Sequence, residues 1–253
     1  MRVNKANGKI RFINHLIEEY ALSVSYNPDT NSGQAIYNLS FINESDFEYA
    51  IKAFKETHRV GLCISDRVKF LHPGDEIGGI QIPDGRIGVC NLCSLTIDAL
   101  MIREGVPHNA VGGGVLEVSD GECQRFTSMI RYNSTTVDPT ELYISREAVS
   151  VSNVIKKGTG YILANVREFH MDAENLVYNL FDKLTDVGFT GIIDIGPPNL
   201  HIFGVPVTPE YQGVAMAGGT NWFAYFQESG YEVVVNAIKG LIEYNSMDSI
   251  LDF

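Results

Sequence analysis

Two segments of this sequence could bind an anion through backbone amides. Gly112-Gly113-Gly114 stands ahead of an apolar run, and Gly218-Gly219-Thr220-Asn221 opens a predicted helix. Cys93-Ser94-Leu95-Thr96 is the corresponding helix start in the first half of the chain. Amides at a helix amino terminus lack partners within the helix and carry a partial positive charge, so they attract carboxylates. A tight turn is the structural alternative for both glycine segments.

Arginines on predicted strands could supply the charge that a small dianion needs. Strand pleating fixes the side-chain direction there, and a dianion buried without such partners is costly. The predicted ligand-lining residues are Cys93, Ser94, Thr96, Gly113, Gly114, Gly219, Thr220 and Asn221, with Arg86, Arg125 and Arg167 as candidate cations.

The sequence contains no complete motif for a metal site or for catalysis. Cys90-Asn91-Leu92-Cys93 has the spacing of a metal or redox motif, but zinc needs two more ligands and no second CxxC or HxxxH pair exists. We interpret these cysteines as packed thiols. No GxSxG motif is present, and the six histidines have no recognisable nucleophile partner. No metal site and no catalytic residue are therefore predicted.

Composition indicates an acidic globular protein. The 253 residues are 45% apolar, and 19 Lys and Arg stand against 31 Asp and Glu, for a net charge of -12. That charge repels phosphate backbones and anionic lipids, so direct DNA contact is not expected. The amino terminus does not resemble a secretory signal, and no apolar run approaches the roughly 18 residues that cross a membrane. The expected location is the cytoplasm.

An internal repeat organises the elements that must position these residues. Gly79-Ile80-Gln81-Ile82 recurs 125 positions later as Gly204-Val205-Pro206-Val207, whereas residues 36–46 align with 162–172 at an offset of 126. Each copy reads β-α-β-β-α-β, the order of ferredoxin-like units. The predicted fold is α+β, a two-layer sandwich of internally duplicated ferredoxin-like units.

Local signals give the expected boundaries. Ser45 with Glu48 resembles a capping box, Asp172 is the expected cap of the equivalent helix, and Gly188 is its expected left-handed stop. Short strands are expected at 61–65 and 200–203. The predicted segments are a lead-in helix and hairpin over 1–33, the first copy over 34–118, connecting strands (124–132 and 141–145) within 119–159, the second copy over 160–244, and an acidic tail over 245–253.

The string from Gly79 through Arg86 to Val89, followed by Cys93-Ser94-Leu95-Thr96 and Gly113-Gly114-Val115-Leu116, resembles the regulatory domain of the archaeal nitrogen repressor NrpR. The resemblance continues through Gly196-Pro197-Pro198-Asn199 to Gly218-Gly219-Thr220-Asn221 and covers almost the whole chain. It implies a regulatory domain that senses 2-oxoglutarate as effector, with no other cofactor. The residues before Arg11 are too few for a winged helix, so the chain resembles either a stand-alone member that acts through a separate winged-helix DNA-binding protein of the family or a part of a longer protein. A homodimer is the expected assembly.

Two other classes of function stay open at this point. A small-molecule enzyme could use the same duplicated scaffold, because fold alone does not exclude it. A dimerisation scaffold without ligand is the second alternative, in which the glycines only make turns. The preferred expectation is an effector sensor that is not an enzyme.

Overall fold

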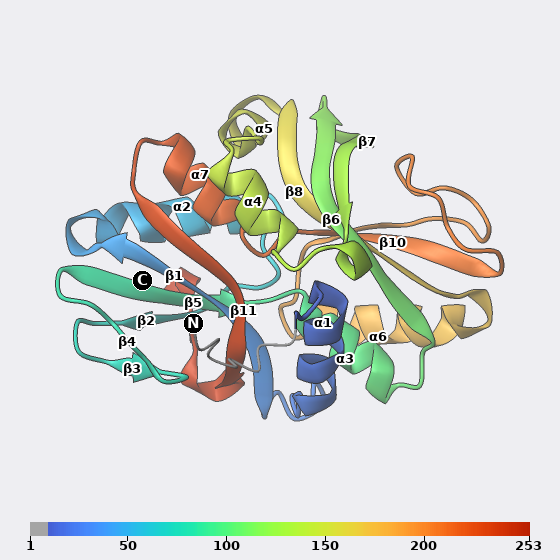
Figure 1. Cartoon of the computed structure of the whole chain (residues 1–253), viewed down its shortest axis with the longest axis horizontal. Coiled ribbons are helices and arrows are strands. Elements are labelled where there is room, and N and C mark those ends of the chain that lie inside the picture. The colour runs from blue at the N-terminus through green and yellow to red at the C-terminus, as the bar shows by residue number, and fades with distance from the viewer. Residues whose placement is uncertain (1–9) are drawn as a thin grey trace, which may run out of the picture.

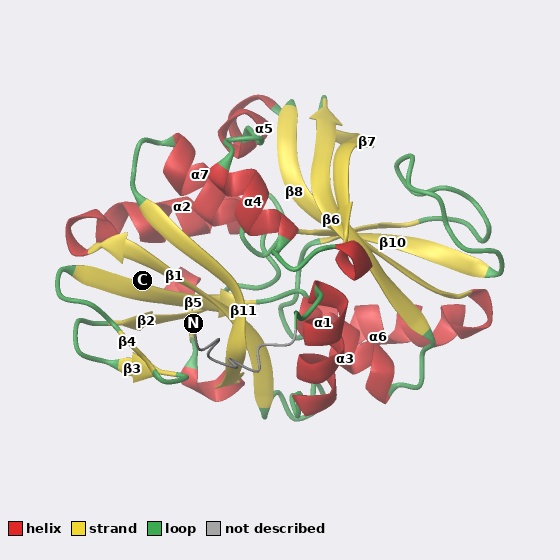
Figure 2. Cartoon of the chain, viewed as in Figure 1, coloured by secondary structure: helices red, strands yellow, loops and turns green. Residues whose placement is uncertain are grey.

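The computed structural model describes residues 10–253, which form two antiparallel sheets with helices packed against both (Figures 1 and 2). Interior strands of both sheets are buried along almost their whole length, and they carry polar as well as apolar side chains. The α+β class predicted from the sequence is confirmed.

The first sheet contains five strands in the order β11-β1-β5-β2-β12. These strands are β1 (Gln34–Asn43), β2 (Arg67–Leu71), β5 (Arg86–Leu92), β11 (Val233–Glu243) and β12 (Asp248–Ser249).

The second sheet also contains five strands, in the order β7-β6-β8-β10-β9. They are β6 (His108–Ser119), β7 (Glu122–Arg131), β8 (Gly160–His170), β9 (Ile192–Ile195) and β10 (Tyr211–Ala217), and a separate small hairpin joins β3 (Glu76–Ile77) to β4 (Ile80–Gln81).

The α-helices of the described chain are α1 (Ile13–Ser23), α2 (Phe47–Arg59), α3 (Leu95–Arg103), α4 (Pro139–Ser145), α5 (Val151–Lys157), α6 (Glu174–Asp186) and α7 (Asn221–Glu228).

The two copies exchange their final helix and strand. In the first sheet the position beside β1 is filled by β11, which belongs to the second copy in sequence. In the second sheet the position beside β8 is filled by β6, which belongs to the first copy. The second helix of each copy crosses to the other sheet together with the strand that comes after it. Helix α7 packs on α2 and helix α3 packs on α6, as Figure 1 shows. Each sheet is thus built from both halves of the chain.

Aromatic stacking secures one side of this exchange. Phe54 of α2 and Trp222 of α7 stack with ring centroids 5.1 Å apart and planes 3° from parallel. Both side chains are fully buried. Rings of this size remove large apolar areas from water, so the α2–α7 contact stabilises the first sheet through residues about 170 positions apart in the chain.

The segment predicted as a strand over 141–145 is wrong: it is helix α4. Asp138 caps this helix, since its Oδ1 accepts from Thr140 N–H at 2.7 Å, and Pro139 holds the first helical position. Proline at the first position and an acidic cap are typical helix-start signals. The strand predicted over 124–132 is β7.

The predicted helix caps at Ser45 and Asp172 are also wrong. Short 3-10 turns, Glu44–Asp46 and Met171–Ala173, precede α2 and α6, and neither helix has a side-chain cap. The Ser45 hydroxyl donates instead to Asp46. Gly188 does adopt the left-handed conformation after α6, with φ of 90°.

Other predicted boundaries differ in kind. The strands expected at 61–65 and 200–203 are turns that hold only the isolated bridges Ser65–Phe189 and Ile202–Val205. The final residues do not hang free as a tail, because β12 pairs with β2 and Ile250 is buried. The expected lead-in helix corresponds to α1, and residues 1–9 of that prediction lie outside the described residues.

Candidate functional site

In both copies a side chain at the start of the second helix accepts a hydrogen bond from a strand amide. Ile36 N–H donates to Thr96 Oγ1 at 3.0 Å, and Leu163 N–H donates to Asn221 Oδ1 at 2.8 Å. The helix residues differ by 125 positions but the strand residues by 127, so the offset of 126 expected for these strands is wrong by one residue. Thr96 and Asn221 are fully buried. Their side chains hold the helix starts against the sheets, and neither is among the residues that line the four cavities and clefts considered below.

A small buried cavity lies where these two helix starts meet. It has room for about 20 Å³ and is bounded by equivalent residues from both copies. Asn38 and Asn165 come from β1 and β8, and the remaining walls come from the helix starts, α1, α4, β11 and the turn after β7. Its lining residues are Ile17, Asn38, Cys93, Ser94, Leu95, Tyr132, Asp138, Thr140, Asn165, Gly218, Gly219, Thr220, Ala237 and Ile238.

Hydrogen-bond donors face this cavity. Thr220 is 2% exposed, and its Oγ1 has no hydrogen-bond partner within residues 10–253. Buried polar atoms almost always have a partner, so an orphaned hydroxyl in a cavity wall indicates a position for a ligand or water atom. The backbone of the opposite helix start brings Ser94 to the same cavity.

Arg167 lies directly behind the cavity wall and has no exposed surface. Its Nη2 is 2.7 Å from Asp98 Oδ2 and 3.1 Å from Ser94 Oγ, and Nη1 donates to Asn165 Oδ1. Because the guanidinium is planar, these contacts fix the orientations of Ser94 and Asn165 together. Ser94 Oγ accepts from both Arg167 and Asn165, which leaves its own O–H as a donor.

Asp98 balances the charge of Arg167. Burial alone would raise the pKa of the Asp98 carboxyl, but the Arg167 charge and the hydrogen bond with His108 outweigh it and hold the pKa below its ordinary value. His108 Nε2 is 3.4 Å from Asp98 Oδ1. Asp138, in the cavity wall, has the opposite shift, because burial raises its pKa more than the Thr140 hydrogen bonds lower it.

The structure therefore brings together four of the predicted lining residues, Cys93, Ser94, Gly219 and Thr220, with Arg167 behind them. The other candidates lie elsewhere.

Gly113 and Gly114 sit inside strand β6 rather than in an anion-binding turn. A Cβ on Gly113 would lie 3.2 Å from Pro139, and one on Gly114 would lie 2.2 Å from Ser128 O of β7. Their role is close strand packing.

Two of the candidate arginines are surface residues. Arg86 pairs with Glu232 at 3.2 Å, and Arg125 pairs with Glu117 at 3.0 Å with its side chain 71% exposed. Neither lines the cavity.

Asn38, Asn165, Tyr132 and Asp138 were missed by sequence reasoning. The usable signal was an asparagine with apolar neighbours on both sides in a strand of each copy, Tyr37-Asn38-Leu39 and Ala164-Asn165-Val166, because buried polar side chains are uncommon without a partner. Tyr132 and Asp138 have no such signal, since the turn that carries them lies outside the repeat.

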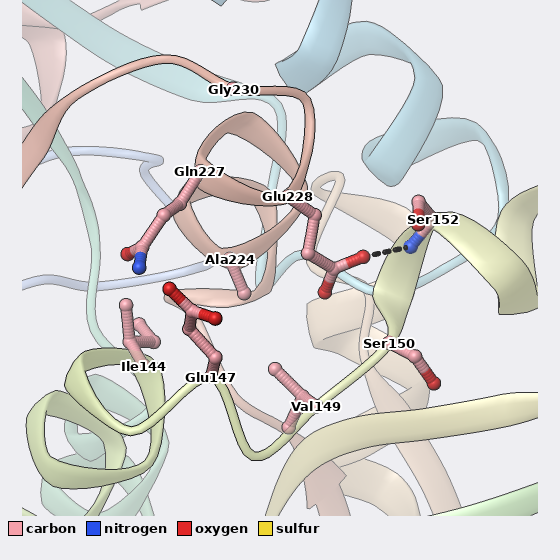
Figure 3. Close-up of a pocket in the computed structure, with 9 residues that line it drawn as sticks. All are labelled: Ile144, Glu147, Val149, Ser150, Ser152, Ala224, Gln227, Glu228 and Gly230. Carbon is pink, nitrogen blue, oxygen red and sulfur yellow. Dashed lines mark hydrogen bonds between the residues drawn. The ribbon is translucent and has the colours of Figure 1, made fainter.

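Three wider clefts were compared as sites for an anion. The cleft of about 430 Å³ between α5 and α7 holds Glu147 and Glu228, and Glu228 accepts from the amides of Val151 and Ser152 at 2.8 Å each (Figure 3). Two carboxylates make this cleft repulsive to a dianion.

The cleft of about 530 Å³ beside β6 holds Arg131 and His108 but also Glu18 and Glu168. The third cleft, about 380 Å³, is lined mainly by Val137, Leu142 and residues 233–235, with Glu141 as its charged group. The central cavity is thus favoured by its buried donors rather than by its size.

The thiols are packed, as predicted. Cys90 and Cys93 are buried free cysteines, and burial raises the pKa of each to about 12. Within residues 10–253 no group of three or more His, Cys, Asp or Glu side chains is arranged to hold a metal ion. None of the helices in that part of the chain is long and apolar enough to cross a membrane.

Comparison with known proteins gives a consistent set of relatives. Residues 10–249 match the family described as NrpR regulatory domains NRD1 and 2. Global nitrogen regulator NrpRI of Methanosarcina mazei is 33% identical over 239 residues, which cover 94% of this chain and 73% of that protein. Global nitrogen regulator NrpR of Methanococcus maripaludis is 30% identical, with 89% of this chain and 38% of that protein covered.

A solved structure shares the fold. The crystal structure of a nitrogen repressor-like protein from Methanococcus jannaschii matches with a TM-score of 0.81 at 26% identity, over 96% of this chain and 100% of that chain.

Proposed function

The chain belongs to the NrpR regulatory-domain family, and from this premise we propose that it senses 2-oxoglutarate in the central cavity and controls repression of nitrogen-assimilation genes. Membership of a family of regulatory domains makes it part of a regulator and not an enzyme. The effector, the assembly and the partner are the proposed parts.

The observation that carries the proposal is the donor set of the cavity. Within residues 10–253 Thr220 Oγ1 has no partner, and Ser94 has a free O–H that the Arg167 guanidinium orients from behind. Carboxylates are recognised by converging hydroxyl and amide donors with a nearby cation, because these donors replace the hydration that burial removes. The cavity lies between the two copies, so a ligand in it contacts both halves of the chain.

The size of the cavity determines how an effector would act. About 20 Å³ on this measure has room for one or two water molecules, each of which needs about 10–15 Å³, and not for a five-carbon dicarboxylate. Binding must therefore separate the walls. An effector that fits only the opened form shifts the population toward that form, and that difference in affinity is what changes the activity of the regulator.

The proposed partner is a winged-helix protein of the same family, and the proposed assembly is a homodimer. The net charge of -12 disfavours direct binding to DNA by this chain. The matched part of Methanococcus maripaludis NrpR is 38% of that protein, so the relatives carry substantial further sequence. A separate DNA-binding protein would supply the operator contact.

Isothermal titration with 2-oxoglutarate tests this proposal, with succinate and glutamate as competing ligands. We expect Ser94→Ala and Thr220→Val each to weaken binding by about tenfold or more, since each removes a donor to a charged oxygen. Arg125→Ala is the matched control, because that side chain is exposed and far from the cavity, and it should bind as the parent does.

Equal weakening by Arg125→Ala would place the site elsewhere. Absence of saturable binding to the parent, alone and with the DNA-binding partner, would favour a scaffold without ligand.

A further inference from the structure

Strand β11 contains a bulge beside the central cavity. In its pairing with β1, Tyr37 faces Gly240 and Leu39 faces Asn236, so residues 237–239 all stand opposite Asn38. In the equivalent pairing of the second sheet, Gly113 alone stands opposite Asn165. The second sheet has a smaller irregularity close by, where Val111 is the one extra residue between Ala110 and Gly112. The two copies therefore differ in the size and position of the bulge, and extra residues of this kind often occur beside functional sites.

The backbone of the bulge is strained. Ile238 has φ of 53°, in the left-handed region that β-branched residues rarely adopt. Such strain persists only where the surroundings hold it, and it clusters at ligand clamps and switch regions. A strained segment releases energy when it opens, so less work is needed to move it than an unstrained strand of the same length.

Two side chains hold the bulge in place. Ala237 N–H donates to Glu141 Oε1 of α4 at 2.5 Å, and Ile238 N–H donates to Asn38 Oδ1 of β1 at 3.2 Å. These bonds replace the regular ladder bonds that the bulge interrupts. β11 is the edge strand of its sheet, so within the described chain no further strand supports it on the outer side.

The bulge lines the central cavity and adjoins the groove beside it. Ala237 and Ile238 line the cavity on the inside. On the outside, Glu141 and Leu142 of α4 and the preceding residues of β11 line the open groove of about 380 Å³. The walls from β1, β8 and the two helix starts are held by ladder pairing and by the Thr96 and Asn221 hydrogen bonds.

We propose that residues 237–239 form the gate of the central cavity and that the Glu141 carboxylate is the latch that holds it closed. The inference rests on the proposed function only for the identity of the ligand. When the latch bond breaks, the strained turn relaxes and the cavity connects with the groove, while both sheets keep their other pairings. Opening of this local kind requires less free energy than unfolding of the sheet.

Cys93 provides a reporter of gate opening that needs no effector. Its thiol lines the cavity, whereas Cys63 and Cys90 are buried away from it and report wider unfolding. In a Cys123→Ser background, labelling by a small methanethiosulfonate is followed by mass spectrometry of each cysteine peptide. We expect Glu141→Leu to raise the Cys93 rate about tenfold relative to Cys63 and Cys90. Glu141→Gln keeps an acceptor for Ala237 N–H and should change that ratio less than about twofold.

Equal acceleration of all three thiols, or none at Cys93, would overturn the proposal. Hydrogen exchange of the unsubstituted protein gives a second test that does not depend on a variant folding well.

The Ala237 and Ile238 amides should exchange hydrogen faster than the β1 and β5 ladder amides, and low concentrations of denaturant should not change their rate, as expected of local opening. Exchange of these two amides only through global unfolding would also contradict the gate.

The effector separates this inference from the proposed function. If 2-oxoglutarate binds, Glu141→Leu should speed its association with the protein by several-fold. If the parent does not bind 2-oxoglutarate but the Cys93 ratio responds to Glu141→Leu, the effector assignment fails and the gate stands. If 2-oxoglutarate binds and the Cys93 ratio is unchanged, the gate fails and the sensor stands.

Discussion

At the scale of single residues, the Arg167–Asp98 pair sets the polarity of the central cavity although neither side chain lines it. The two side chains have no exposed surface, and Arg167 also orients Ser94 and Asn165. A buried ion pair adds little net stability over an apolar pair, but removal of one partner leaves an uncompensated charge. The pair is thus better explained by its ordering of the site than by its contribution to folding.

We predict that Asp98→Asn lowers the free energy of unfolding by about 3–5 kcal/mol, because Arg167 then stays charged and unpaired in a dry environment. Urea denaturation at neutral pH measures the loss. Adding Arg167→Met to Asp98→Asn should recover part of it, since the unpaired cation is then absent. A loss below about 1 kcal/mol would show that water reaches the pair.

The same pair makes stability depend on pH in a defined direction. The pKa of Asp98 is lower in the folded protein than its ordinary value of 3.8, so its contribution is complete above 3.8 and is lost as the pH falls through the lower folded value. Urea midpoints between about pH 5 and pH 2 should therefore fall less steeply in Asp98→Asn than in the parent. An identical slope in both proteins would contradict this direction.

Ser94 and Thr220 were predictable as site residues, because each follows an apolar strand at the start of a helix. Arg167 was named as a candidate, but nothing in the sequence indicated that Asp98 would bury it. That pairing depends on α3 lying across β8, which is a tertiary contact between residues 69 positions apart.

At the scale of elements, strand β6 shows why its glycines are needed. Gly112, Gly113 and Gly114 pair in regular register with Arg131, Ile130 and Met129 of β7, ahead of the two bulges in this ladder. A Cβ on Gly112 would lie 2.5 Å from the Ile130 carbonyl oxygen, and one on Gly114 would lie 2.2 Å from that of Ser128, which leaves no space for either side chain. The sequence indicated a turn or an anion loop at 112–114 because runs of glycine are most often found there. The sheet geometry that demands them involves β7, whose path is not encoded locally.

We predict that Gly114→Ala destabilises the protein by at least about 2 kcal/mol, since the new methyl group would lie 2.2 Å from Ser128 O. Gly196→Ala is the matched control, because its φ is not left-handed and its nearest contact would be 3.5 Å away. That control should stay within about 0.5 kcal/mol of the parent. Thermal or urea unfolding measures the free energy of unfolding of the two variants. Equal values would contradict the prediction, because they would mean that β7 moves away from β6 without cost.

Helices α2 and α6 were predictable because their apolar periodicity extends over 13 residues each. Most strands were predictable because β-branched and aromatic residues alternate or cluster between turn residues. Helix α4 was not, because seven residues give too little periodicity to distinguish a helix from a short strand. The Asp138-Pro139 start was the informative signal, and it outweighs the apolar content of Leu142 and Ile144.

At the scale of the whole molecule, the exchange of α3–β6 and α7–β11 joins the two halves more strongly than a linker would. The sequence pattern β-α-β-β-α-β is the same whether the last strand returns to its own sheet or crosses to the other. The duplication was therefore predictable from the residue offsets. The exchange of helices and strands between the two sheets was not, because it depends on which of two similar sheet edges the last strand of each copy pairs with.

A chain divided in the exposed loop after α4 should remain a single particle. Fragments 1–147 and 148–253, co-expressed with a tag on one of them, are expected to purify together and elute near the size of the intact protein. Each sheet needs strands from both fragments, so neither fragment alone should give the intact protein's circular dichroism. Separation of the fragments at micromolar concentration would contradict the exchanged topology.

The pairing of β11 with β1 also has a consequence for synthesis on the ribosome. The bonded residues Asn38 and Ile238 are 200 positions apart. At about 5–20 residues per second, β1 emerges on the order of 10–40 s before the strand that covers its edge. During that interval the nascent chain presents an apolar, unpaired edge to solvent, so its yield should depend on chaperones that bind emerging chains.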